Sequence, residues 1–174
     1  MDALALYYWD ACLFYEHLKG ENVSVDRKIA VGEILIDNRD RRNRICTSVI
    51  THAEILPKKL GPEAEAKYWS MFGSMYFFDI DISRQILQLA REIKDHYYVA
   101  PTEERPSGKM LQTGDALQLA TAIAHDVTEF HTRDGNNKGS KVGLLGLAGA
   151  EGKVCGLYPL KIVSPATVQG NLDV

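Results

Sequence analysis

The chain has 174 residues, of which 45% are hydrophobic and 25% are charged, a balance typical of a globular protein that buries a core. Twenty lysines and arginines against 23 aspartates and glutamates give a net charge of −3, which excludes a general basic field, so a nucleic-acid partner would need a local basic rim. No apolar run reaches the ~18 residues that span a bilayer, and the N-terminal residues lack the basic region of a signal peptide, so we expect no membrane segment.

Apolar and amphipathic segments alternate from the start of the chain. Residues 3–9 form a short apolar and aromatic run that predicts a buried strand. The next residues, 11–18, are amphipathic and predict a short helix that ends near Gly20. Ser24 is a suitable N-cap for a second helix over residues 25–43.

The same alternation continues through the middle of the chain. Residues 44–50 predict a second strand, and a helix begins at residues 51–56 until Pro57 kinks or ends it. A further helix is predicted over residues 62–75, because it opens with a proline, which suits a first helical turn. A third strand follows at residues 76–82.

Two capped helices and two strands are predicted in the rest of the chain. We expect Ser83 and Thr113 to cap these helices, which cover residues 84–98 and 114–126. The strands are predicted at residues 127–132 and 160–164. The glycine-rich residues 143–153 are interpreted as a loop with a short helix, packed by its leucines.

Strands that alternate with helices predict an α/β fold. We expect a three-layer α/β/α sandwich with a mostly parallel sheet of four or five strands. Neither a repeat nor a linker divides the chain, so residues 1–174 are interpreted as one domain with an extended segment at residues 138–157. Three widely separated cysteines, Cys12, Cys46 and Cys155, are typical of a reduced compartment, and we expect the cytoplasm.

Four acids fall at the carboxyl ends of the predicted strands, the edge where α/β sheets bind ligands. Asp10 ends the first strand, and Glu54 lies just after the second. Asp115 lies in the first turn of the helix before the fourth strand, and Asp134 ends that strand.

Each acid also has an ordinary structural explanation. Asp10 could cap a helix, and Asp134 could belong to a turn. Asp115 would gain about 0.3–1 kcal/mol from its interaction with the helix dipole. Glu54 fits a capping box with Thr51. If Ser48 is the cap instead, the Glu54 side chain is available for another role. The four signals gain weight because they fall together on one edge of one sheet.

Four pieces of sequence follow one another along the chain: YYWD, CTSVITHAEIL, TGDALQLATAIAH and FHTRD. In these pieces and their order, the chain resembles the PIN domain, and within it the toxin ribonucleases of VapC type. The resemblance covers residues 3–136 and resumes in LKIVSP; its most specific part is GDALQLATAI followed by FHTRD. It implies that Asp10, Glu54, Asp115 and Asp134 are the family's acidic residues that bind Mg²⁺ or Mn²⁺. Thr132 then stands at the Ser/Thr position beside the last acid.

Clustered carboxylates repel one another, and hard cations such as Mg²⁺ and Mn²⁺ relieve this repulsion. Two such ions about 3.5–4 Å apart activate water and stabilise the leaving oxygen of a phosphodiester. Asp10, Asp115 and Asp134 are therefore predicted ligands, and Glu54 binds a metal or orients the attacking water. The resemblance implies single-stranded RNA as substrate, products with a 5′-phosphate and a 3′-hydroxyl, and an antitoxin partner.

Basic residues near the last acid are candidate substrate contacts. Arg133, Lys138 and Lys141 could contact phosphates, although a solvated loop explains the two lysines equally well. Trp69 and Met75 lie in an apolar stretch that belongs either to the core or to a homodimer surface.

The chain departs from the family pattern at two places. Ala11 and Cys12 follow the first acid where relatives often have polar residues, and Asn137 falls where many have another acid. These departures favour an alternative, a non-catalytic PIN-like module that binds RNA or protein. A phosphoacceptor domain of response-regulator type is a third possibility, but it needs a lysine at the end of its last strand, and Lys161 lies near the start.

Overall fold

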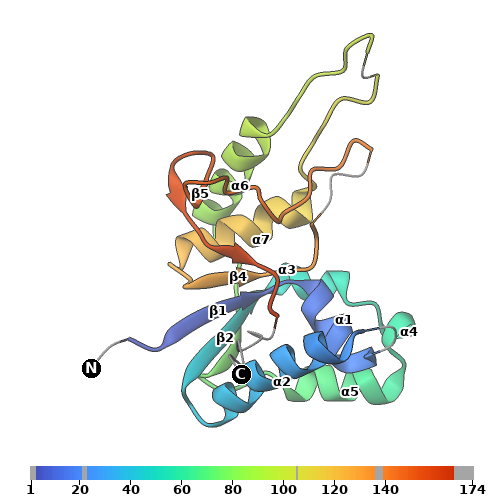
Figure 1. Cartoon of the computed structure of the whole chain (residues 1–174), viewed down its shortest axis with the longest axis vertical. Helices are drawn as coiled ribbons and strands as arrows, with labels where there is room; N and C mark the ends of the chain where they lie inside the picture. Colours follow the sequence, from blue (N-terminus) through green and yellow to red (C-terminus); the bar gives the residue numbers. More distant parts are fainter. Residues whose placement is uncertain (1–2, 21–22, 105, 136–138, 167–174) are drawn as a thin grey trace, which may run out of the picture.

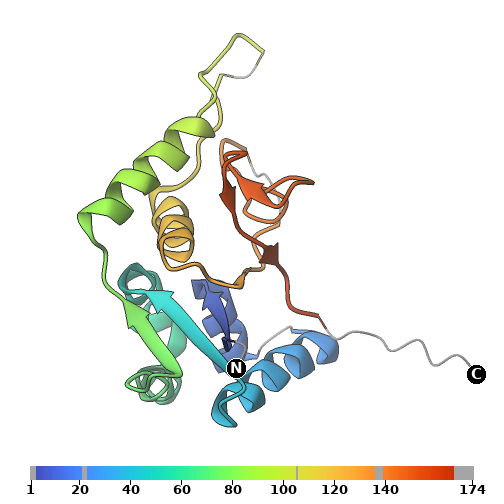
Figure 2. The ribbon, with the colours of Figure 1, turned by 90° about the vertical axis from the view of Figure 1, so that its left-hand side faces the viewer.

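The computed structural model describes residues 3–20, 23–104, 106–135 and 139–166. Five parallel strands form one sheet in the order β3-β2-β1-β4-β7 (Figures 1 and 2). The strands are β1 (Ala5–Trp9), β2 (Asn43–Ser48), β3 (Phe77–Ile80), β4 (Glu129–His131) and β7 (Ile162–Val163). In the register of the sheet, Tyr8 of the central strand β1 is paired with Cys46 of β2 and with Phe130 of β4.

Helices cover one face of the sheet around an aromatic core. They are α1 (Ala11–Lys19), α2 (Val25–Arg39), α4 (Pro57–Leu60) and α5 (Pro62–Ser70). Trp9, Phe14 and Phe77 pack edge to face in this core, with ring centroids 5.6–6.1 Å apart. The short helix α3 (Val49–Glu54) follows β2 at the carboxyl edge of the sheet.

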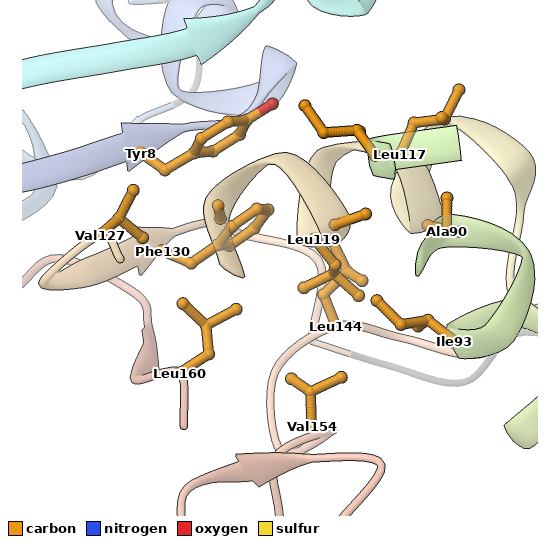
Figure 3. Packing of buried hydrophobic residues seen from close by; sticks show 14 of the residues in the cluster. Tyr8, Ala90, Ile93, Leu117, Leu119, Val127, Phe130, Leu144, Val154 and Leu160 are labelled. Carbon is orange, nitrogen blue, oxygen red and sulfur yellow. The ribbon is translucent and has the colours of Figure 1, made fainter. Parts of the chain in front are cut away.

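The other face is covered by α6 (Arg84–His96) and α7 (Thr113–Ala124). Tyr8 and Phe130 of the sheet stack at 4.9 Å against the buried face of α7, which includes Leu119 (Figure 3). The C-terminal segment, residues 139–166, covers this core on the side of α7 opposite α6 and buries Leu144 and Val154 (Figures 2 and 3). This segment contains a small antiparallel hairpin, β5 (Lys153–Val154) and β6 (Tyr158–Pro159).

The predicted α/β/α fold with a parallel sheet is confirmed, and so are two predicted helix caps. Ser24 accepts a hydrogen bond from the Arg27 amide and Ser83 one from the Ile86 amide. The prediction that Thr113 caps α7 is wrong. Gln112 occupies the N-cap position without a side-chain capping bond, and Thr113 is already helical, with its hydroxyl accepting a hydrogen bond from Lys94 Nζ at 2.8 Å.

Other boundaries also differ from prediction. The second helix ends at Arg39, because residues 43 onward pair with β1, and the helix that opens at Pro62 ends at Ser70. Residues 143–152 form turns without a helix, and Gly146, Gly149 and Gly152 there adopt left-handed backbone angles that a right-handed helix does not allow. Within the described ranges, no helix is long and apolar enough to cross a membrane.

Candidate active site

Asp10 lies where β1 ends, and it caps α1 by accepting a hydrogen bond at Oδ1 from the Cys12 amide at 2.9 Å. The Cys12 thiol donates to the same oxygen at 2.6 Å, and the Thr132 hydroxyl donates to Oδ2. The carboxylate is therefore both a helix cap and the member of a polar network between two neighbouring strands. Burial raises the pKa of Asp10 to about 6, although the hydrogen bonds from Cys12 and Thr132 act in the opposite direction.

Glu54 is the last residue of α3, which Ser48 caps, so the capping box with Thr51 does not form. Its Oε2 accepts a hydrogen bond at 2.5 Å from the Gln118 amide of α7. Its Oε1 lies against Gly114, at a spot that any larger residue's Cβ would fill. Burial, followed by the charges of Asp115 and Asp10, raises the pKa of Glu54 to about 7.

Asp115 and Asp134 share one cation from the chain itself. The Lys141 ammonium lies 2.8 Å from Asp134 Oδ2 and 3.5 Å from Asp115 Oδ2. These contacts are ion pairs, and both Oδ2 atoms are buried and accept no hydrogen bond in the described structure. Burial and the nearby Asp134 raise the pKa of Asp115, against the opposing effect of Lys141. For Lys141, burial lowers the pKa, but the two carboxylates outweigh it and raise the pKa.

Two backbone connections hold Asp134 in place. Its amide donates to the Thr132 hydroxyl at 3.0 Å, and its carbonyl accepts hydrogen bonds from the Leu144 and Leu145 amides at 2.9 and 2.8 Å. The C-terminal segment therefore helps to fix the loop that carries Asp134 and Lys141.

The donor set suits a hard divalent cation. Four carboxyl groups converge from different elements, the pKa values of Asp10, Glu54 and Asp115 are raised, and two buried carboxylate oxygens have only an ion pair. Within the residues that the structure describes, no three acidic, histidine or cysteine side chains already surround one point. A metal would therefore have to displace Lys141 from Asp115 and Asp134 and draw the carboxylates together.

The other predicted site residues have different outcomes. The Arg133 guanidinium is turned to Glu16, with contacts of 2.8 and 2.9 Å, and it also donates to Ser164 and Pro165. Its side chain is only 10% exposed, so the phosphate contact predicted for Arg133 has no support in this arrangement. Asn137 and Lys138 lie outside the described residues.

Sequence reasoning missed two contributors. Gln118 lies one helical turn after Asp115, so its position on the same side of α7 could have been read from the i, i+3 spacing. Cys12 was interpreted as the loss of a polar partner, yet its thiol supplies a hydrogen bond to Asp10. A thiol donor at this place has no sequence signal of its own.

Comparisons with known proteins identify the family of the chain and its fold. The sequence pattern of the PIN domain matches residues 7–138. No curated protein sequence matches the chain. A protein from a toxin–antitoxin complex of Klebsiella pneumoniae is similar in structure, with a TM-score of 0.52 and 22% identity over 94% of this chain and 99% of that chain.

Two further solved structures share the fold. VapC20 of Mycobacterium tuberculosis, described as a toxin that cleaves the sarcin–ricin loop, aligns with a TM-score of 0.55 and 14% identity over 75% of this chain and 91% of its own. A chain of VapBC2 from Rickettsia felis, solved with a DNA fragment of its promoter, aligns with a TM-score of 0.56 and 15% identity over 92% and 98%. The match over residues 7–138 establishes that the chain belongs to the PIN domain family, a family of nucleases.

Proposed function

We propose that this protein is an endoribonuclease that hydrolyses phosphodiester bonds in single-stranded RNA with the help of Mg²⁺ or Mn²⁺. The observation that carries the proposal is the convergence of Asp115 and Asp134 on one cation, Lys141, beside the buried acids Asp10 and Glu54. A site that holds a lysine between two carboxylates has the charge to hold a divalent ion in its place.

In this proposal Asp10, Asp115 and Asp134 are the metal ligands, and the bound ion supplies an activated water and stabilises negative charge on the phosphate. Asp10 is held by Cys12 and Thr132, so its carboxylate cannot turn away from the sheet edge. The displaced Lys141 remains beside the site, where its ammonium can contact a phosphate oxygen.

Glu54 is suited to accept a proton from the attacking water. In the metal-free site burial and the neighbouring acids raise its pKa to about 7, and a bound cation would lower this pKa, so that Glu54 is ionised and able to accept the proton at neutral pH. Gln118 occupies Oε2, which leaves Oε1 beside Gly114 as the oxygen that orients the water. Binding of a metal through this same oxygen is the other role open to Glu54.

We further propose that the protein is a cytoplasmic toxin whose activity a small antitoxin protein inhibits. Support comes from its similarity to chains of the toxin–antitoxin complexes from Klebsiella pneumoniae and Rickettsia felis. Trp69 and Met75 are 52% and 69% exposed, which makes them candidates for a homodimer surface.

The alternative is a non-catalytic module that binds RNA or protein. Ala11 favours it, because it follows the first acid where relatives often have a polar residue. The hydrogen bond from Cys12 weakens it, because the first acid keeps a polar support.

The test is to incubate the purified protein with single-stranded and structured RNAs in Mn²⁺, Mg²⁺ or EDTA, and to analyse the ends of any products. Asp10→Asn and Asp115→Asn should each lower cleavage by more than roughly 100-fold. Asp126→Asn is the matched control, because Asp126 is exposed and has a left-handed φ of 48° that asparagine tolerates. Cleavage that persists in both site variants would reject the assigned site, and a wild type that neither cleaves RNA nor binds Mn²⁺ in a calorimetric titration would favour the alternative.

A further inference from the structure

A basic pocket of about 300 Å³ lies close to Asp10, since Cys12 is one of its lining residues. Most of its lining comes from α1, α2 and α4, and α1 packs against the other two helices, whose ribbons Figure 1 shows. Its walls include four cationic side chains and one carboxylate, namely Lys19, Arg27, Lys59, Arg133 and Glu16. Cationic side chains therefore outnumber carboxylates in this lining, in a chain whose net charge is −3.

The single carboxylate of the pocket is already neutralised. Glu16 is 4% exposed at its side chain, and Arg133 binds both of its oxygens in a forked arrangement. Arg133 also donates to Ser164 and Pro165, so its donors are used within the fold. Arg133 thus neutralises the charge of Glu16, and the positive charge of Arg27 has no further carboxylate in the pocket to balance it.

Arg27 keeps donors for a ligand. One of its terminal nitrogens, Nη2, donates to Glu16 at 2.6 Å, which fixes the guanidinium in the pocket wall. Its side chain is still 41% exposed, and its other terminal nitrogen, Nη1, has no hydrogen-bond partner among the described residues. A fixed guanidinium with unused donors is a suitable group for an anion with several oxygens.

Lys59 is held in place without being neutralised. Its ammonium lies 4.0 Å from the centre of the Tyr15 ring, and no ion pair joins it to a carboxylate of the described residues. The Tyr15 ring is itself fixed, because its hydroxyl donates to the Glu54 carbonyl at 3.1 Å and accepts from the Leu56 amide at 2.8 Å. Lys59 therefore presents its charge at a defined place.

The pocket shares residues with the surroundings of the acidic cluster. Cys12 lines the pocket and donates its thiol proton to Asp10 Oδ1. Tyr15 lines it and bonds to the backbone of Glu54. An RNA strand whose scissile phosphate lies at the acids would bring a neighbouring phosphate to these cations.

We infer that this pocket binds a backbone phosphate of single-stranded RNA next to the bond that is cut, with Arg27 and Lys59 as the contacting residues. The inference rests on the proposed function for the strand's placement, but the binding it describes needs no metal and no cleavage.

The experiment measures binding of a fluorescently labelled single-stranded RNA by anisotropy in EDTA, so that no cleavage occurs. Arg27→Gln and Lys59→Gln should each weaken binding by roughly tenfold, as expected for a lost charge-assisted contact. The slope of log affinity against log salt concentration should fall by about 0.7 for each lost phosphate contact. The control is Arg39→Gln with Arg42→Gln, which removes two exposed charges at the opposite edge of the sheet.

Each outcome decides the inference. If the pocket variants keep the wild-type affinity and salt slope, the inference is wrong. If a glutamate-rich peptide of equal charge competes as well as unlabelled RNA, the pocket recognises charge alone and the phosphate assignment fails. Lys59 is exposed, so its variant remains informative even if Arg27→Gln, which loosens Glu16, lowers the melting temperature.

Parallel cleavage assays with Mn²⁺ separate this inference from the proposed function. If the wild type cleaves RNA and the pocket variants bind RNA normally, the pocket inference is wrong and the proposed ribonuclease activity stands. If the wild type cleaves no RNA and the pocket variants lose RNA affinity, the pocket inference stands and the proposed ribonuclease activity is wrong.

Discussion

The Thr132 hydroxyl joins Asp10 to Asp134: it donates a hydrogen bond to the Asp10 carboxylate and accepts one from the Asp134 amide at 3.0 Å. Thr132 is fully buried and directly follows β4, whose neighbour β1 ends just before Asp10. One hydroxyl therefore sets the position of two acids that are 124 residues apart in sequence.

Thr132→Val should remove the hydrogen-bonded link between Asp10 and Asp134, while the valine side chain keeps nearly the shape of threonine. It leaves a buried carboxylate oxygen and a backbone amide without a partner, which should lower the free energy of unfolding by about 1–3 kcal/mol in a urea titration. The Mn²⁺ affinity should fall by roughly 10–100-fold, as for other groups that orient metal ligands. Thr132→Ser keeps the hydroxyl and serves as control; equal Mn²⁺ affinity in the valine and serine variants would contradict this role.

Gln118→Met should reduce metal affinity without a loss of stability. Gln118 is 2% exposed, its amide donates to Glu54, and its own Oε1 is buried without a hydrogen-bond partner in the described structure. Methionine removes the donor to Glu54, but it also removes the unpaired oxygen, and it fills a similar volume. We expect the melting temperature to change little while Mn²⁺ binding weakens by roughly tenfold in calorimetry.

A purely structural role for Gln118 predicts the reverse pattern. In that case Gln118→Met would lower the melting temperature and leave Mn²⁺ binding unchanged. Gln118→Glu adds a second test, because a further carboxylate beside Glu54 should raise the apparent pKa of the pair and make Mn²⁺ binding more dependent on pH.

Much of the fold and the placement of the acids could be predicted, because their signals lie in neighbouring residues of the sequence. Ser24 and Ser83 cap helices through bonds to their own chain neighbours, and the acids follow strands whose apolar residues are visible in sequence. The parallel order of the strands then brings Asp10 and Asp134 to one edge, since β1 and β4 are neighbours.

The parts that could not be predicted depend on contacts between distant segments. The pairing of Arg133 with Glu16 joins residues 117 positions apart, and no pattern around either residue indicates it. Lys141 was equally compatible with a solvated loop, and only the fold places its ammonium between Asp115 and Asp134. Thr113 and Gln112 are both polar, and Gln112 takes the N-cap position without a side-chain capping bond, so no local signal separates the two.

Lys141→Gln should lower the stability of the metal-free protein and raise its affinity for Mn²⁺. The variant leaves Asp115 and Asp134 without their counter-charge, so the melting temperature in EDTA should fall. It also removes a cation that competes with the metal; a partly exposed ion pair is worth about 1 kcal/mol, so Mn²⁺ affinity should rise by about fivefold. Lys153→Gln, at an exposed lysine of β5, is the matched control. Weaker Mn²⁺ binding by Lys141→Gln would show instead that the lysine positions the carboxylates.

The pH dependence of stability without metal should reveal the buried acid. Burial raises the pKa of folded Asp10 to about 6 from its ordinary 3.8, so the folded protein holds this proton more tightly than the unfolded chain. The stabilisation from this proton is complete below the unfolded pKa and is lost as the pH rises through the folded pKa. His17 and His131 act in the opposite direction in the acid range, because burial lowers the pKa of both, and a comparison of variants is therefore needed.

Asp10→Asn keeps a neutral side chain at every pH, and it also removes a charge that helps to raise the pKa of Glu54, so it reports two contributions that act in the same direction. Between pH 5 and pH 8 in EDTA, the variant should gain about 1 kcal/mol in free energy of unfolding relative to the wild type, measured by urea titration at each pH. Saturating Mn²⁺ should remove that gain at pH 8, because the metal stabilises the ionised wild-type carboxylate and has no such ligand in the variant. A difference between the two proteins that stays constant with pH would mean that Asp10 ionises normally, and that the acidic cluster is less confined than its burial indicates.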